Sequence, residues 1–187
     1  MDNAILGALI GVGGIIIGFM LTSVWDSRRE MQRSVAARRE LARALLAEVE
    51  ALLERYTEVV ATPIQQWQQG QPLELGGYVR SANFFAVYDG NTGKLGSFVD
   101  QDAATIVRAY TLAKAHLQSI NLVVETMREY HRQIVPYRVI QNPIGSGLEA
   151  DLQAYLNVAC PRLRTESQAL VTATDAAKTA LRRYAEG

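Results

Sequence analysis

Residues 4–25, AILGALIGVGGIIIGFMLTSVW, form a stretch of 22 residues without a charged side chain. An α-helix rises ~1.5 Å per residue, so this stretch would be about 33 Å long, enough to cross the ~30 Å hydrocarbon core of a bilayer. Only a helix would satisfy the backbone hydrogen bonds of such a segment in lipid. Trp25 ends the stretch with a ring that favours the membrane–water interface. The stretch therefore predicts an N-terminal transmembrane helix, with residues 1–25 as the anchor.

A cleavable signal peptide is the alternative interpretation of this segment. Its first residues, Met-Asp-Asn, carry no Lys or Arg, whereas a signal peptide begins with a basic region. The apolar run is also longer than the usual core of a signal peptide, and no small-x-small cleavage motif precedes Asp26. We therefore expect the segment to remain in the mature protein.

Arginines are concentrated directly after the apolar segment. The stretch from Asp26 to Arg43 holds three acidic side chains and six arginines, at positions 28, 29, 33, 38, 39 and 43. No basic residue precedes the apolar segment. The positive-inside rule then places the N-terminus outside and the C-terminal domain in the cytoplasm. The same arginines could also form a solvated helix face or contact anionic headgroups.

Four glycines share one face of the predicted anchor. Gly7, Gly11, Gly14 and Gly18 fall within about 60° of arc at 100° per residue. Small residues in this register let a second helix approach closely, although glycine is also common in membrane helices generally. The stripe predicts association with another copy of the chain or with another membrane protein.

The composition limits what the rest of the chain can be. The chain has 187 residues, 49% of them hydrophobic, and a formal net charge of zero. Residues 26–187 are enough for one domain. Balanced charge argues against binding to nucleic acid. Cys160 is the only cysteine, so an intrachain disulfide is excluded.

The first helix of this domain follows the anchor without a break. Residues 26–61 contain neither Gly nor Pro, and apolar residues recur in steps of three and four from Val35 to Val59. Pro63 is expected to end this helix, because proline lacks a backbone donor. Residues 63–83, rich in Gly and Pro, are expected to form a connection.

A second helix is predicted to begin near Asp100 and to bury an apolar stripe from Ile106 to Ile134. Pro136 is expected to end it, with a turn over residues 136–146.

A third helix is predicted from about Ser146 to Tyr184, in which Pro161 should cause a kink or a break into two helices. The predicted fold is all-α: a transmembrane helix followed by an antiparallel bundle of three or four long helices.

The segment 84–99 interrupts this helical pattern. FFAVY at 84–88 and LGSFV at 95–99 flank a turn sequence that contains Asp89-Gly90. Such a pattern is typical of a β-hairpin. An isolated two-stranded ribbon is only marginally stable, so a structured loop without strands is the alternative.

The loop DGNTGKLGSFVD, residues 89–100, partly resembles a calcium-binding loop. Asp89 and Asn91 match its first and third positions. Gly93, however, supplies no ligand at the fifth position, and Lys94 stands where the sharp turn needs glycine. We expect no calcium site.

The same loop does not form a phosphate-binding loop, because no glycine lies five residues before Gly93 and Leu95 follows the lysine. The simplest interpretation is a turn in which glycines supply positive φ. The alternative is a loop that contacts a partner. The candidate contact residues are Asp89, Asn91, Gly93, Lys94 and Gly96.

No pattern in the rest of the chain predicts catalysis, a metal site or a cofactor. His116 and His131 lack the i, i+4 partner of a helical zinc site, and His131 is expected in the core or at its boundary. Cys160 has no recognisable base and is expected to be a buried thiol. The acidic residues lack the Glu-x-x-His pairs of di-iron bundles. We therefore expect no enzyme.

The pattern F-x-V-Y-D-x-N-x-G-x-L-G, from Phe85 to Gly96, follows a membrane helix and a charged stalk. In this combination the chain resembles a set of uncharacterised bacterial single-pass membrane proteins. The resemblance implies an anchored helical layout and a bacterial inner membrane, and it transfers no catalytic residue.

These features predict a single-pass inner-membrane protein whose cytoplasmic bundle binds other proteins, as a scaffold or accessory subunit. The alternative is a sensory or signalling module in which helix shifts carry a membrane event to a cytoplasmic partner.

Overall fold

The computed structural model describes residues 2–75, 84–139 and 144–186, with their side chains from residue 25 onward except at 138–139. Within these ranges the regular structure is helical and no strand is present. The predicted all-α fold is therefore confirmed for the described part of the chain.

Three long helices dominate the structure, and shorter helical segments connect them. In chain order the elements are α1 (Asp2–Tyr56), the π-helical η1 (Thr57–Ala61), α2 (Thr62–Gln66), α3 (Ala86–Asn91), the 3-10 segment η2 (Thr92–Ser97), α4 (Asp100–Val139) and α5 (Ile144–Glu186).

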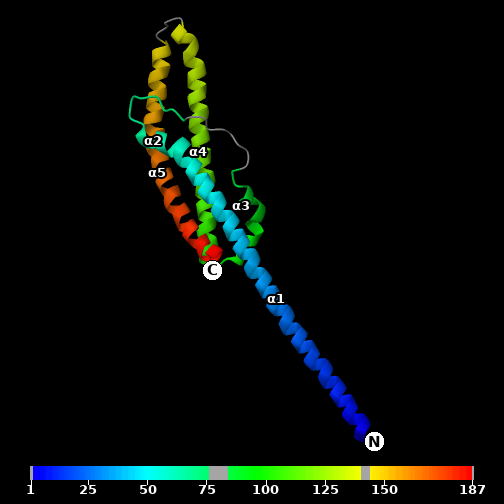
Figure 1. Cartoon of the computed structure of the whole chain (residues 1–187). Coiled ribbons are helices and arrows are strands. Elements are labelled where there is room, and N and C mark those ends of the chain that lie inside the picture. Colours follow the sequence, from blue (N-terminus) through cyan, green and yellow to red (C-terminus); the bar gives the residue numbers. More distant parts are fainter. Residues whose placement is uncertain (1, 76–83, 140–143, 187) are drawn as a thin grey trace.

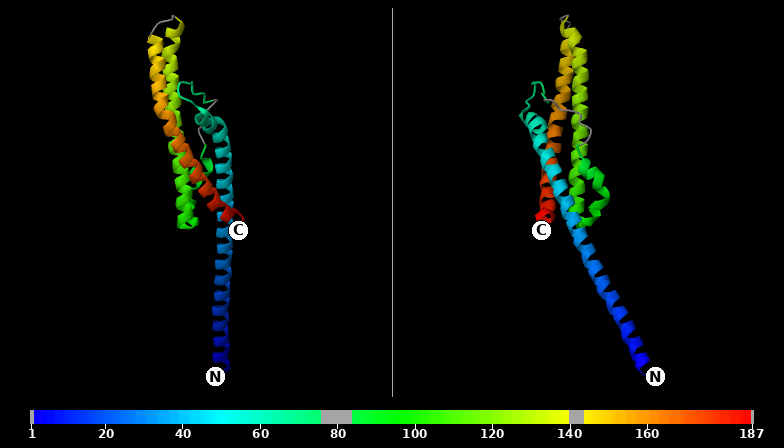
Figure 2. Two further views of the ribbon diagram at one scale, coloured as in Figure 1. Left: turned by 90° about the vertical axis from the view of Figure 1, so that its left-hand side faces the viewer. Right: turned by 45° about the vertical axis from the view of Figure 1, so that its right-hand side comes forward.

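The long helices form a bundle, as predicted. Helices α4 and α5 make an antiparallel hairpin, and α1 lies along the half of it that is far from the hairpin loop (Figure 1). Helix α1 runs parallel to α4 and antiparallel to α5, and its N-terminal part projects out of the bundle (Figures 1 and 2). The C-terminus of α5 lies beside α1 where α1 enters the bundle.

The projecting part of α1 places the predicted anchor outside the bundle. The backbone of residues 2–24 is helical, but their side chains lie outside the described residues, and so do those of the predicted glycine stripe. Among the described residues, no helix has an apolar stretch long enough to cross a membrane. From residue 25 to residue 37 every side chain is exposed.

Pro63 does not end the first helix, contrary to the prediction. Helix α1 passes into the π-helical segment η1, and the helical path continues through Pro63 to Gln66. In this wider turn the Thr62 N–H bonds to the carbonyl of Thr57, five residues earlier. A π-turn widens the backbone just before the proline, where a normal turn would clash with its ring.

The two other helix prolines are also tolerated. Helix α4 runs past Pro136 to Val139, so the predicted helix end at Pro136 is wrong. Helix α5 contains Pro161 and stays one helix, so the predicted break is wrong, while Figure 2 shows α5 bending along its length. Both prolines are exposed, and buried residues lie close to each of them: Ile134 near Pro136, and Cys160 and Leu163 near Pro161. Packing of such residues offsets the loss of one backbone hydrogen bond.

The segment 84–99 is a structured loop, and the predicted hairpin is wrong. Its helical part consists of α3 and η2, and Tyr88, Leu95 and Phe98 of the segment pack onto the bundle. The backbone N–H groups of Val87 and Tyr88 donate to the carboxylate of Glu48 on α1, at 2.7 and 3.1 Å. A carboxylate from another helix thus caps the start of α3, and this favours a helical turn over a strand.

Most of the buried hydrophobic side chains that the structure describes belong to two clusters along the bundle. The proximal core, near the entry of α1, comprises Leu41, Ala42, Leu45, Val49, Tyr88, Leu95, Phe98, Ile106, Tyr110, Leu181 and Ala185. The distal core, near α2, comprises Val60, Ile64, Trp67, Leu73, Ile120, Val123, Ile134, Leu152, Leu156, Ala159, Cys160 and Leu163. Between the two cores lies a layer with buried polar groups.

Arginines from neighbouring helices cap the C-terminal ends of α2 and α5. Arg39 and Arg43 on α1 donate to the carbonyl of Ala185 at the end of α5, each at 3.2 Å. Arg164 on α5 donates to the carbonyl of Ile64 at 2.9 Å and also to those of Gln65 and Trp67. Helix-terminal carbonyls lack partners within their own helix, so these arginines tie α1 and α5 together at both ends.

Candidate functional site

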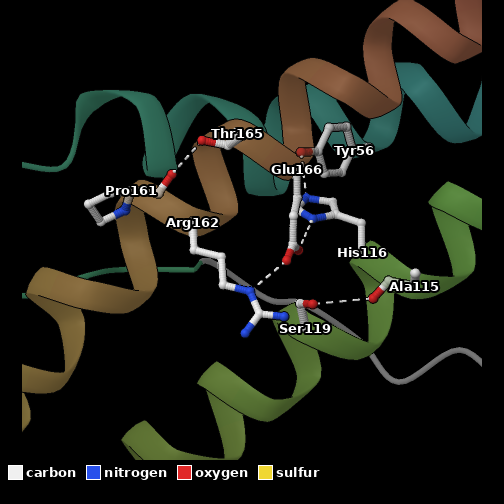
Figure 3. A network of polar contacts seen from close by, with 8 residues as sticks. All are labelled: Tyr56, Ala115, His116, Ser119, Pro161, Arg162, Thr165 and Glu166. Atoms are coloured by element: carbon white, nitrogen blue, oxygen red, sulfur yellow. Dashed lines mark hydrogen bonds and ion pairs between the residues drawn. The ribbon is translucent and has the colours of Figure 1, made fainter.

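The layer between the two cores contains a chain of hydrogen bonds that joins all three long helices. Figure 3 shows the His116 ring of α4 between Tyr56 at the end of α1 and Glu166 of α5. The Tyr56 hydroxyl lies 2.8 Å from Nε2 of His116, and Nδ1 of His116 lies 3.1 Å from the Glu166 carboxylate. The imidazole of His116 therefore contacts both neighbouring helices, α1 and α5.

Further polar groups complete this layer. Arg162 donates its Nε–H to the other oxygen of Glu166 at 2.8 Å. His116 is only 3% exposed and Ser167 only 2% exposed, whereas Arg162 lies on the surface. The layer thus runs from a buried ring to a solvated guanidinium.

The surroundings decide the protonation of these groups. Burial lowers the pKa of His116 from its ordinary value, although the Glu166 carboxylate opposes this shift. Burial raises the pKa of Tyr56, which keeps its hydroxyl protonated. Burial alone would raise the pKa of Glu166, but hydrogen bonds from Arg162, His116 and Ser119 outweigh it and lower that pKa.

At neutral pH the arrangement is consistent with a neutral His116. In that state Nδ1–H donates to Glu166 and Nε2 accepts a hydrogen bond from the Tyr56 hydroxyl. Every member then has a partner, and no hydroxyl is left as a free nucleophile. The layer therefore joins α1, α4 and α5 through hydrogen bonds between their side chains.

An apolar cavity of about 100 Å³ lies beside this layer. Side chains of α1, α4 and α5 and the residues just before α3 line it. Tyr56 belongs both to the polar layer and to the cavity wall. The cavity and the polar layer therefore share one side chain at the junction of the three helices.

A second polar cluster holds the segment 84–99 against the bundle. Besides capping α3, Glu48 accepts a hydrogen bond from the Tyr110 hydroxyl at 2.9 Å. Tyr110 stacks on Tyr88 with ring centroids 3.9 Å apart. Burial, together with the hydrogen bond to Glu48, raises the pKa of Tyr110 far above its ordinary value. This cluster fastens α3 to α1 and α4.

The candidate contact residues of the loop occupy different positions. Asp89 forms an ion pair with Lys114 at 2.5 Å, and Asn91 donates to the Val87 carbonyl of its own helix at 2.8 Å. Gly93, Lys94 and Gly96 are exposed. The structure thus places Asp89 and Asn91 in contacts within the chain, and Asp89 is exposed together with Gly93, Lys94 and Gly96.

The loop glycines do not adopt the positive φ that the sequence suggested. Within the described residues Gly70, at φ 86°, is the one glycine with positive φ. Gly90, Gly93 and Gly96 have ordinary helical or turn conformations, with no other group close to the position of a Cβ. The expected role of these glycines is therefore wrong, because the loop is built from helical turns.

Sequence reasoning missed His116 as the polar centre and favoured His131 for the interior. His131 is exposed and its Nδ1 lies 2.8 Å from the Met127 carbonyl. His116 precedes Leu117, which belongs to the predicted apolar stripe. The buried face of α4 is turned slightly from that stripe, and His116 is therefore buried. Its partners are 50 and 60 residues away in the chain, and no local pattern connects them.

Cys160, the other candidate nucleophile, lies in the distal core. Cys160 is buried, and burial raises the pKa of its thiol to about 11, which suppresses the reactive thiolate. Among the residues with described side chains, no group of three or more His, Cys, Asp or Glu could hold a metal ion.

Comparison of the chain with models of protein families, with curated proteins and with solved structures found no match.

Proposed function

We propose that this chain is a single-pass protein of a bacterial inner membrane whose cytoplasmic bundle binds other proteins as a scaffold or accessory subunit. The observation that carries the proposal is α1, a single helix from Asp2 to Tyr56. One end of this helix holds the apolar sequence 4–25, and the other end packs into the bundle.

The part of α1 between these ends supports a role as a stalk. Side chains 25–37 are exposed, and the first residue of the proximal core is Leu41. At ~1.5 Å per residue, this stretch would hold the bundle roughly 20 Å from the end of the apolar segment. That distance leaves the bundle surface accessible to a partner beside the membrane.

The arginines of α1 support the proposed cytoplasmic orientation. Arg39 and Arg43 cap α5, and Arg38 lies over the ring of Tyr184. Arg28, Arg29 and Arg33 are exposed and closest to the apolar segment. No Lys or Arg precedes the apolar segment, so these three arginines give its C-terminal flank the excess of positive charge.

The bundle itself supports binding rather than catalysis. The polar groups of the His116 layer and of the Glu48 cluster bond to one another, whereas Arg38 Nε, Gln153 Oε1 and Asn157 Oδ1 are buried without a partner among the described residues. The loop end of the α4–α5 hairpin extends beyond α2 and presents long helix surfaces (Figure 1). The glycine stripe of the anchor, Gly7, Gly11, Gly14 and Gly18, adds a candidate contact with a second copy or another membrane protein.

One observation favours the alternative, a sensory or signalling module. Tyr56 lies on the same helix as the proposed anchor and bonds to His116 in the interior. A rotation or shift of α1 would therefore change the polar layer directly. This alternative shares the anchor and the orientation with the main proposal.

Topology reporters and photo-crosslinking test the proposal in the native host. A reporter that works only in the cytoplasm should be active when fused to the C-terminus, and a reporter that works only outside the cytoplasm should be inactive there. The protein should also resist alkaline extraction from membranes. A photo-crosslinker at the exposed Leu122 or Val158 should give a discrete product with one other protein, whereas one at the buried Ile120 should not. Repeated recovery of the chain alone from every exposed position would overturn the binding role.

Two variants separate contact in the membrane from signalling. Gly11→Ile with Gly14→Ile should weaken self-association if the stripe packs against a second copy. Inserting two residues after Glu30 rotates the anchor by about 200° relative to the bundle. A scaffold keeps its crosslinks after this insertion, whereas a module that transmits helix rotation changes them.

A further inference from the structure

The cavity beside Tyr56 has an almost entirely apolar wall. Leu52 and Leu53 of α1 and Ala113 and Leu117 of α4 line it, and Phe85 belongs to the same wall. Its volume is about 100 Å³, and it is partly open to solvent. An apolar cavity of about 150 Å³ can hold a benzene ring, so this one can take the end of a short hydrocarbon chain.

The hydroxyl groups in the cavity wall are already bonded. Tyr56 bonds to His116, and Tyr110 bonds to Glu48. Thr174 donates to the carbonyl of Leu170 in its own helix, at 2.9 Å. A hydrocarbon chain placed there would leave none of these groups without a partner, so burying it would carry no penalty for a broken hydrogen bond.

One charged side chain lines the same cavity. Arg55 is exposed and has no ion pair or hydrogen bond with the residues that the structure describes. A guanidinium carries donors in a fork that fits a carboxylate. An uncommitted cation at the mouth of an apolar cavity is complementary to a molecule with an apolar body and one anionic end.

We propose that this cavity binds a free short-chain or medium-chain fatty acid, with its hydrocarbon end beside Leu52 and Leu117 and its carboxylate at Arg55. The site is independent of the proposed role in protein binding. It adds a ligand that would contact α1, α4 and the segment before α3 together.

Equilibrium binding to the full chain in nanodiscs of zwitterionic lipid tests this site, with empty nanodiscs as the blank. The probes are labelled octanoate, octanol and octylammonium at low ionic strength, where exposed charges are least screened. Octanoate should bind saturably and more tightly than the other two. Binding no greater than to empty nanodiscs, or equal binding of octanoate and octylammonium, would overturn the proposal.

Charge reversal at Arg55 distinguishes the contribution of its guanidinium to binding from that of the apolar wall. Arg55→Glu should weaken octanoate binding about tenfold or more, strengthen octylammonium binding and leave octanol unchanged. Arg108→Glu, which changes an exposed arginine of α4 outside the cavity, is the matched control and should change none of the three. If both variants behave alike, Arg55 does not hold the carboxylate.

Filling the cavity tests the wall. Ala113→Phe should abolish binding of both octanoate and octanol while the circular dichroism and melting temperature show that the bundle is still folded. The larger side chain of this variant lies beside the core and could prevent folding. In that case the Arg55→Glu variant, at an exposed position, still tests the site. Unchanged octanoate binding in a folded Ala113→Phe variant would place the ligand elsewhere.

Discussion

The imidazole of His116 has one hydrogen-bond partner on each neighbouring helix, so its protonation is coupled to the packing of the bundle. Its pKa is lower in the folded chain than the ordinary value of 6.5. Below about pH 6.5 the unfolded chain therefore binds more protons than the folded chain, and folding loses stability as the pH falls. This contribution is complete above that pH and decreases on acidification.

His116→Asn should remove this pH dependence and also lower the stability at pH 7.5. Asparagine cannot reach both Tyr56 and Glu166, so at least one buried group loses its partner, which costs about 1–3 kcal/mol. Thermal unfolding between pH 7.5 and 5.5 measures both effects. His131→Asn, at an exposed position, is the control and should follow the wild type. A wild-type melting temperature that is constant or rises on acidification over this range would contradict the argument.

Two glycines give opposite predictions for the same substitution. Gly90 lies in α3 with ordinary φ and open space around its Cβ position, so Gly90→Ala should stabilise the chain by about 0.5–1 kcal/mol. Gly70 has φ 86°, so Gly70→Ala should destabilise it by about 1–2 kcal/mol. Denaturant unfolding of the two variants side by side gives the comparison. Equal effects of both changes would show that backbone conformation does not decide the outcome.

At the scale of helices, the guanidinium of Arg164 caps the C-terminal end of α2, which continues the helical path of α1. Arg164 donates to the carbonyls of Ile64, Gln65 and Trp67. Arg164→Gln should cost about 2 kcal/mol and speed amide hydrogen exchange in residues 62–75, because three carbonyls lose a charged donor. Arg128→Gln on the exposed face of α4 is the control and should cost less than about 0.5 kcal/mol. Unchanged exchange in both variants would show that the cap contributes nothing.

The long helices could be predicted from sequence because their signal is local. The stripe from Ile106 through Ile120 to Ile134 repeats in steps that keep one face of α4 apolar, and all three residues are buried. The ends of the helices could not be predicted in the same way. Pro63 and Pro136 each remove one backbone donor, but the packing of the whole helix outweighs that loss.

The candidate site was less predictable, because its members come from distant segments. Glu48 caps α3 across 39 residues, and no local rule connects the two. A hairpin signal around Asp89 was therefore overridden by a contact that only the folded bundle supplies. Likewise, His116 becomes the polar centre only because Tyr56 and Glu166 arrive from α1 and α5.

At the scale of the whole molecule, the exposed part of α1 lacks the packing that supports the bundle. Residues 25–37 have no core contacts, so their helix should open locally far more often than the bundle. Arg39 and Arg43, only a few residues further on, are held by the carbonyls of α5.

Limited trypsin digestion of the full chain in proteoliposomes should therefore cut after Arg28, Arg29 or Arg33 and release a folded bundle. Mass spectrometry of the released fragment identifies its first residue. Arg39→Gln with Arg43→Gln should loosen the end of α5 and lower the melting temperature of the fragment. A wild-type fragment that begins after Arg39 or Arg43 would show that the junction of α1 with α5 opens as readily as the stalk.

The contact of Arg39 with Ala185 joins groups 146 residues apart. A ribosome therefore finishes α1 long before it makes the helix that covers it. In that interval Leu45 and Val49, which the completed bundle buries, remain open to chaperones, proteases and other nascent chains. Cells depleted of chaperones should therefore lose more of this protein during translation than after α5 has packed onto α1.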